Sequence, residues 1–420
     1  MRIVGSSSAP PPRSRPVRYR ELFANREFAT LWVADVLSEI GSQVARIAIA
    51  ALVFARTESA GLTAAAFAIT YLPHLLGGAV LASLADRWPR REMLIGADVA
   101  RAVLTVSILI PGMPLLAALG LIFLVELIRI PFGAARLATL ADVLDDDQFA
   151  AGNGLVAATQ QILLVAGFAG GGVLVALIGP RNALGVDALT YLLSALALLG
   201  LRRRPAPMAD KEQPQGLWRD TAEGLRIVRE TPDMVRNIVL LLLGPAVLNV
   251  TIALAVPYAY YLGGGTALAG AMMAAAPLGS SVGLMLVGRL SAPRRIALAG
   301  PSVICLGLAV AATGLSDHAV VIVAMLLVAG LTMGYLTAVQ AAIATATPAH
   351  ARGRVFGLAN TGMQLGQGAS VVLAGLLAAF LPLQTTLVIA GLTGVALATG
   401  TVLRPRRRAP AQMAEPSPAS

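Results

Sequence analysis

The stretch Leu84-Ala-Asp-Arg-Trp-Pro-Arg-Arg91 is a short polar segment between two long apolar runs. With one acid, three arginines and a proline, it is too polar to lie in lipid and too short to form a domain. A weaker version follows at Gly288-Arg-Leu-Ser-Ala-Pro-Arg-Arg295, again between apolar runs. The Pro-Arg-Arg units begin at Pro89 and Pro293, so they lie 204 residues apart in a chain of 420. We interpret the sequence as one membrane unit written twice.

The composition is that of a membrane protein. Hydrophobic residues make up 57% of the chain and charged residues 13%, with a mean hydropathy of +0.76. A soluble domain carries about 25% charged residues. Apolar runs recur that can cross about 30 Å of hydrocarbon. We predict an all-α membrane protein with twelve transmembrane helices in two pseudo-symmetric six-helix bundles. The expected spans are residues 28–54, 62–84, 92–110, 115–137, 153–178, 182–201, 237–259, 266–288, 296–315, 319–344, 355–380 and 383–403.

The placement of the cations predicts the orientation. With these spans, and with Arg136 counted at the inner end of the fourth, 27 of the 32 Lys and Arg lie on the side that holds both termini, which places that side in the cytoplasm. The net charge of +10 therefore reflects membrane topology, and nucleic acid is not an expected partner. The predicted regions are a disordered cytoplasmic tail at 1–26 without the apolar core of a signal peptide, an amino-terminal six-helix bundle at 27–201, a cytoplasmic linker at 202–236, a carboxy-terminal six-helix bundle at 237–403 and a disordered cytoplasmic tail at 404–420.

Trp218 to Arg229 in the linker has amphipathic spacing, which fits either a helix at the membrane interface or an ordinary linker helix. Other chemistry has little support in the sequence. Cys305 is the single cysteine, and the three histidines have no ligand spacing, so we expect no disulfide, metal or cofactor. The chain has no phosphate-binding glycine loop followed by lysine, and we expect no enzymatic activity.

Ionisable residues lie inside the first six expected spans. Asp35, Glu39, Gln43 and Arg46 lie on one face of the first helix, within an arc of about 80°. Three more groups follow in later spans, namely Asp98 with Arg101, Glu126 with Arg129, and Asp187. Eight such residues in lipid would cost about 20 kcal/mol, so we expect them to face the bundle interior or a wet cavity. The five acids outnumber the three arginines, which predicts that one or two carboxyl groups hold a proton part of the time.

The loop at Asp86-Arg87 followed by Arg90-Arg91 resembles the signature between spans two and three of the major facilitator superfamily, although Ala82 and Pro89 replace its usual glycines. The resemblance extends from Phe28 to about Leu403. Other stretches resemble the bacterial macrolide-efflux and enterobactin-exporter branch, namely Leu31-Trp32, Ser38-x-x-Gly41-Ser-Gln43, Leu72-Pro73, Asp98-x-x-Arg101, Asn153-Gly-Leu155 to Gln160, Asp187-Ala-x-Thr-Tyr191 and Arg352-Gly-Arg-Val-Phe356. Gly167-Phe-Ala-Gly-Gly171 lacks a proline that exporters of this superfamily commonly carry in span five.

The resemblance implies a monomeric transporter in the inner (plasma) membrane, working by alternating access around a cavity between its halves. Our hypothesis is proton-coupled efflux of a small amphipathic or lipophilic compound that is drug-, macrolide- or siderophore-like. An importer or facilitator of the same fold is one alternative, and a non-transporting membrane scaffold or sensor is another. The expected partners are the small-molecule substrate, protons and the lipid bilayer.

The sequence offers candidates for three kinds of site. The proton-coupling candidates are Asp35, Glu39, Glu126 and His74, with Arg46, Arg101, Arg129 and Asp98 as charge partners. A static ion-pair network is the alternative for the charged residues, and a packing role for His74. The candidates for an inner-gate loop, or for charges that only set topology, are Asp86, Arg87, Arg90, Arg91, Arg136 and Asp142. The substrate-cavity candidates are Gln43, Gln160, Asn249 and Gln364.

Overall fold

The computed structural model describes residues 19–75, 88–204, 225–229, 231, 233–348 and 351–403. Within these ranges the chain is helical and contains no strand. The helices of the amino-terminal group are α1 (Tyr19–Ala24), α2 (Arg26–Thr57), α3 (Ala60–Ile69), α4 (Leu72–Leu75), α6 (Arg90–Ile108), α7 (Leu115–Val143) and α8 (Asp146–Leu198). Those of the carboxy-terminal group are α10 (Met234–Tyr261), α11 (Gly265–Gly288), α12 (Ala292–Ala297), α13 (Ala299–Thr313), α14 (Ala319–Thr332), α15 (Tyr335–Ala346), α16 (Arg352–Phe380) and α17 (Leu383–Leu403).

Several expected features lie outside the described residues. They are Asp86 and Arg87 of the polar loop, Trp218 of the linker, and most of both predicted tails. His74 belongs to α4, but its side chain is not among those described.

Eight stretches of the described chain are long and apolar enough to cross a membrane. One of them, in α8, runs from Gln148 to Leu198 and contains two helical segments, because Gly179 leaves the helical conformation with φ 80°. Only glycine adopts that backbone conformation freely, and the following Pro180 has no amide hydrogen to continue the helix. With α6 and the shorter apolar helices α3 and α13, this set is consistent with twelve spans.

Two expected spans are interrupted. The span predicted at 319–344 divides into α14 and α15 at Met333 and Gly334, where bonds from Met333 N–H to Gly330 and from Leu336 N–H to Met333 tighten the turn. Gly334 also packs directly on the backbone of Gly283 in α11, where a side chain would collide. The span predicted at 296–315 begins in the last residues of the short helix α12 and continues in α13 from Ala299.

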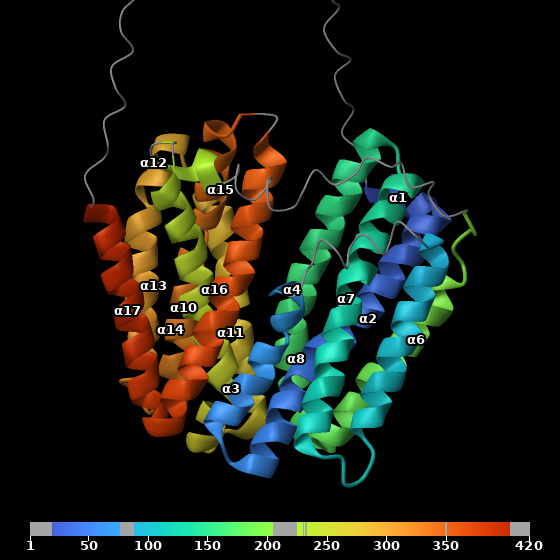
Figure 1. Ribbon diagram of the computed structural model, residues 1–420, viewed down its shortest axis with the longest axis horizontal. Coiled ribbons are helices and arrows are strands. Elements are labelled where there is room, and N and C mark those ends of the chain that lie inside the picture. The colour runs from blue at the N-terminus through green and yellow to red at the C-terminus, as the bar shows by residue number, and fades with distance from the viewer. Residues whose placement is uncertain are drawn as a thin grey trace, which may run out of the picture.

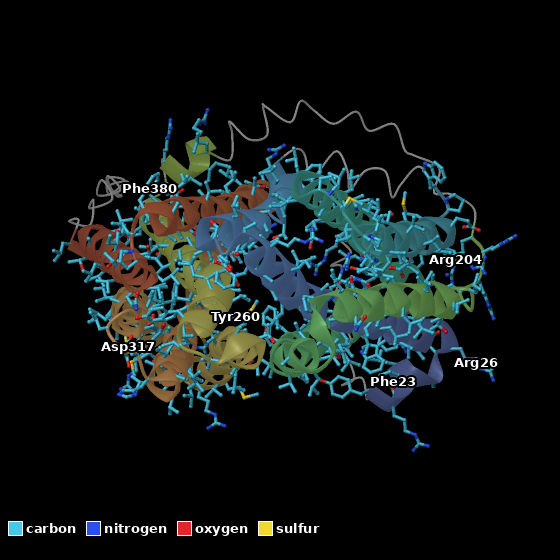
Figure 2. The ribbon with its side chains drawn as sticks, turned by 90° about the horizontal axis from the view of Figure 1, so that it is seen from below. Phe23, Arg26, Arg204, Tyr260, Asp317 and Phe380 are labelled. Carbon is cyan, nitrogen blue, oxygen red and sulfur yellow. The ribbon has the colours of Figure 1, made fainter. Side chains whose placement is uncertain are left out.

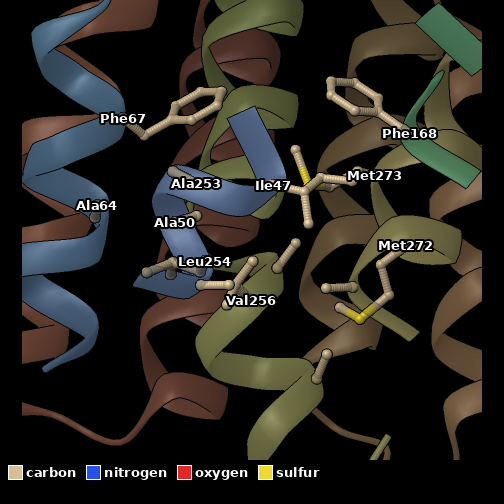
Figure 3. Close-up of a cluster of buried hydrophobic side chains, with 14 of the residues drawn as sticks. Ile47, Ala50, Ala64, Phe67, Phe168, Ala253, Leu254, Val256, Met272 and Met273 are labelled. Atoms are coloured by element: carbon tan, nitrogen blue, oxygen red, sulfur yellow. The ribbon is translucent and has the colours of Figure 1, made fainter. Parts of the chain in front are cut away.

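The two groups of helices converge at one end and diverge at the other (Figure 1). One apolar cluster draws only on residues between 22 and 201, and a second only on residues between 228 and 398. A third cluster, which we call the shared cluster, takes side chains from both groups. Figure 3 shows part of it, including Ile47, Phe67, Phe168, Leu254 and Met273. Its helix segments all lie toward the end opposite α1 and α12, so the groups are joined at that end.

Backbone contacts reinforce this closure. Gly172 of α8 lies against Gly270 of α11, and an added β-carbon at Gly172 would sit 2.7 Å from the Gly270 Cα. Gly61 of α3 similarly faces Gly375 of α16, where a β-carbon on Gly61 would sit 2.9 Å from the carbonyl oxygen. Small residues at such positions let helix backbones approach closely within a membrane. At the same end, seen in Figure 2, Tyr260 of α10 packs against Phe54 of α2 with ring centres 5.3 Å apart.

Candidate functional site

The predicted acidic face of α2 points into the amino-terminal group and meets α7. Arg129 Nη2 donates a hydrogen bond to Glu39 Oε2 across 3.1 Å, and the Gln43 amide donates to Glu39 Oε1. The other guanidinium nitrogen, Arg129 Nη1, lies 3.7 Å from Glu126 Oε2. The side chains of Glu39 and Glu126 are 13% and 14% exposed. Arg129 therefore bridges two carboxylates that are largely, but not completely, removed from the surface.

Asp35, one turn before Glu39, has a different cation. The Arg136 Nη1 atom lies 2.5 Å from Asp35 Oδ1, and Gln160 donates to Asp35 Oδ2 across 3.3 Å. We expected Arg136 at the inner-gate loop, but the structure places its guanidinium with the buried carboxylates. The reason is that Arg136 lies two turns along α7 from Arg129 and so shares its inward face.

Asp98 and Arg101 of α6 form a fully buried pair. Arg101 donates to Asp98 Oδ1, and Ser194 of α8 donates to Asp98 Oδ2 across 2.6 Å. The guanidinium carbon of Arg101 also lies 4.2 Å from the ring centre of Phe132 and 4.5 Å from that of Tyr191. Arg101 is thus held by its own helix neighbour and two rings, and makes no salt bridge to Glu39, Asp35 or Glu126 within the described residues. These contacts are typical of a buried ion pair that holds neighbouring helices together.

Asp187 of α8 lies beside these groups and was not among the predicted site residues. It is 2% exposed, and its Oδ1 accepts no hydrogen bond in the described part of the chain. A cavity of about 40 Å³ is lined by Asp187, Glu126, Arg46 and Tyr191, among others. Arg46 makes no hydrogen bond or ion pair with any described residue. The sequence signal for Asp187 was the excess of acids over arginines, which does not show which acid lacks a partner.

The predicted substrate-cavity amides all bond to protein groups. Gln43 and Gln160 hold Glu39 and Asp35, as described above. Asn249 donates to the Tyr71 hydroxyl across 2.8 Å, which links the two groups of helices. Gln364 accepts from Gln367 across 3.4 Å on the same helix.

A further polar link between the groups was not expected from the sequence. The side-chain amide of Gln161 in α8 donates to the Pro277 carbonyl oxygen across 3.1 Å and to Ser281 Oγ across 3.2 Å in α11. Its neighbour Gln160, which we had selected, faces the interior of the amino-terminal group instead.

The described part of the inner-gate loop ties α6 to the ends of its neighbours. Arg90 donates to the Ala138 carbonyl oxygen across 2.9 Å and forms an ion pair with Asp142, both near the end of α7. Arg91 donates to the Leu199 carbonyl oxygen across 2.7 Å at the end of α8. Arginines at helix carboxyl ends satisfy free carbonyl groups and complement the helix dipole. Among the described residues, no three His, Cys, Asp or Glu side chains gather as metal ligands would.

Comparison with known proteins identifies the class. The chain matches the Major Facilitator Superfamily over residues 31–339 and 294–419, and it belongs to that superfamily. It is 30% identical over 397 residues to the multidrug efflux pump Tap of Mycobacterium bovis (strain BCG / Pasteur 1173P2), an alignment covering 87% of this chain and 91% of that protein. The Tap protein of Mycobacterium tuberculosis (strain ATCC 25618 / H37Rv) matches equally. The resemblance to the efflux branch of the superfamily is thus confirmed.

Solved structures agree with this fold. A point mutant of the nucleoside transporter NupG has a TM-score of 0.72 and 14% identity, covering 89% of this chain and 98% of that one. A bacterial homolog to the human lysosomal transporter Spinster, in an inward-facing and occupied conformation, has a TM-score of 0.72 and 16% identity, covering 93% and 97%. The predicted fold class, an all-α membrane protein of the major facilitator fold, is confirmed. The chain is an integral membrane protein of a transporter family that acts on small molecules.

Proposed function

We propose that the protein is a proton-coupled exporter of small amphipathic or lipophilic compounds. The observation that carries the proposal is the interior group of five carboxyl groups and four arginines within the amino-terminal half of the molecule. The described spans of the other half contain no comparable group. Burying this many charges is unfavourable in a membrane, and such residues commonly mark ion pathways. The outward direction is proposed from the similarity to a multidrug efflux pump.

The two groups of helices are joined at one end by the shared cluster, as expected for one state of an alternating-access cycle. With the orientation predicted from the cations, the shared cluster and the two glycine contacts seal the outer side. The inner side is where the apolar clusters of the two groups are separate. We infer an inward-facing state in which substrate enters between the groups from the cytoplasm or the inner leaflet.

Glu39 is the proposed point of competition between substrate and protons. Its carboxylate is partly exposed and held by Arg129 and Gln43. A substrate that separates Glu39 from Arg129 leaves a buried carboxylate without its cation, and such a group binds a proton readily. Glu126 shares the same arginine, so a change in the charge of one carboxylate alters the electrostatic environment of the other.

The placement of the protein in the membrane is proposed from the sequence. We place the protein in the inner (plasma) membrane as a monomer with both termini in the cytoplasm. Residues 27–201 and 237–403 form the two moving bundles, and 202–236 join them. Arg90, Arg91 and Asp142, together with Asp86 and Arg87, are proposed to close the inner side in the opposite state.

A drug-susceptibility panel tests the proposal. Cells that express the chain should tolerate higher concentrations of at least one lipophilic compound, and the Glu39→Gln variant at equal abundance should not confer this tolerance. Everted vesicles separate export from import, because an exporter accumulates the compound when the lumen is acidified. Transport without any response to lumen pH would favour a facilitator, and no transport of any panel compound would favour a non-transporting role.

A further inference from the structure

Asp187 differs from the other four interior carboxyl groups. The other four each form a salt bridge with an arginine, namely Asp35, Glu39, Asp98 and Glu126. Asp187 forms none with any described residue, although it is 2% exposed. Its Oδ1 accepts no hydrogen bond from a described residue and faces Gly41 of α2, where an added β-carbon would lie 2.6 Å away. Asp187 Oδ1 therefore packs against the α2 backbone without a hydrogen-bond donor among the described residues.

The charges of the interior balance when one carboxyl group is neutral. Five carboxyl groups share this region with four arginines, Arg46, Arg101, Arg129 and Arg136. A buried carboxylate without a cation or hydrogen-bond donor is strongly unfavourable, and it takes up a proton instead. Because Asp187 is the member without a cation, it is the group expected to be neutral.

No arginine of the described neighbouring helices forms a salt bridge with Asp187 in this state. The charged groups around it include Arg101 and Asp98 of α6, Glu126 of α7, Glu39 of α2 and, in the same cavity, Arg46 of α2. Arg101 is already occupied by Asp98 and two aromatic rings. The helices α3 and α11 carry no ionisable residue.

A small cavity lies between Asp187 and the partly exposed carboxylate of Glu126. Its volume of about 40 Å³ admits a few water molecules but no drug-sized compound. Glu126 and Arg46 line the same cavity, as do Ser42 and Thr105. Glu126 in turn shares Arg129 with Glu39. Water in this cavity would give a proton a continuous polar route between Asp187 and Glu126.

We propose that Asp187 carries the transported proton and that Arg46 becomes its partner once the proton has left. The proton passes from the Asp187 carboxyl group through cavity water to Glu126, and the remaining carboxylate is neutralised by the Arg46 guanidinium across the cavity. Arg46 belongs to α2 and Asp187 to α8, two helices in direct contact through Gly41 and Gly167. Formation of this ion pair would therefore move α2 relative to α8. The transport role rests on the proposed function, whereas the protonation of Asp187 does not.

Infrared spectroscopy of the reconstituted, full-length protein at neutral pH tests the protonation directly. The wild type should show the carbonyl band of a protonated carboxyl group, the Asp187→Asn variant should lack it, and Glu39→Gln should retain it. Asn matches the shape and charge of a protonated Asp, so this variant should fold with unchanged thermal stability. A wild type without the band, or an Asp187→Asn variant that retains it, would overturn the assignment.

Transport of ethidium, a fluorescent lipophilic cation, tests the coupling. The Asp187→Asn variant should exchange ethidium by counterflow but fail to accumulate it against a pH gradient. Full gradient-driven accumulation by this variant would overturn the coupling role. If the wild type moves no ethidium in either assay, the proposed function fails for this probe, and the infrared result still decides whether Asp187 holds the proton.

Discussion

The contact between Gly172 and Gly270 should set how much of the protein is closed on the outer side. In Gly172→Ala, the new methyl group would lie 2.5 Å from the Thr266 carbonyl oxygen, 2.7 Å from the Gly270 Cα and 2.9 Å from the Gly270 nitrogen. All three are backbone atoms, so they can move away only if α8 and α11 separate. Overpacking of this kind costs about 1–3 kcal/mol. Because the clash exists only in the outer-closed state, that state should lose about 5- to 150-fold in population relative to the outer-open state.

Cysteine labelling from outside the cell measures this shift. Cys305 is the single native cysteine, so Cys305→Ser provides a cysteine-free background. Ala253 of α10 is 2% exposed within the shared cluster, and Ala253→Cys reports its opening to a membrane-impermeant maleimide. Gly170→Ala is the matched control, since a β-carbon there meets nothing within 4 Å. Equal labelling rates in the Gly172→Ala and Gly170→Ala proteins would show that the contact between Gly172 and Gly270 does not control closure of the outer side.

Three further predictions concern stability and the links between the halves. Asp98→Asn leaves Arg101 buried without its carboxylate and should destabilise the protein by about 3–5 kcal/mol. This loss should lower the thermal stability in detergent, whereas Glu39→Gln should not lower it. Asn249→Ala removes the hydrogen bond to Tyr71 and should raise the maleimide labelling of Ala253→Cys by about tenfold or less. Arg90→Ala breaks a partly exposed ion pair with Asp142 and should change stability by less than about 1 kcal/mol, so a large loss in the same detergent assay would contradict this.

Much of the interior group could be predicted because hydrocarbon tolerates few isolated charges. Helical periodicity placed Glu39 and Gln43 on one face of the first span, and they are hydrogen-bonded. Spacing of three likewise predicted the contacts of Asp98 with Arg101 and of Glu126 with Arg129, both of which are present. These are relations within one helix, which the sequence contains directly.

Relations between helices were harder to predict. Arg46 was expected beside the acids of its own helix but has no ion pair with a described residue, whereas Arg136 reaches Asp35 from α7. These pairings depend on the rotation and vertical offset of α2 against α7, which spacing along one helix does not specify. The glycine contacts pose the same difficulty, because 42 glycines in the sequence do not show that Gly172 meets Gly270.

Proton movement driven by substrate alone is the most direct test of the central claim. Proteoliposomes containing the protein and a pH-sensitive dye receive an outward or inward gradient of a compound found by the susceptibility panel, with no initial pH difference. We predict that the lumen pH changes, that the change reverses sign with the gradient, and that it disappears in Asp187→Asn. If the wild-type protein moves the compound and the lumen pH does not change, transport is not coupled to protons.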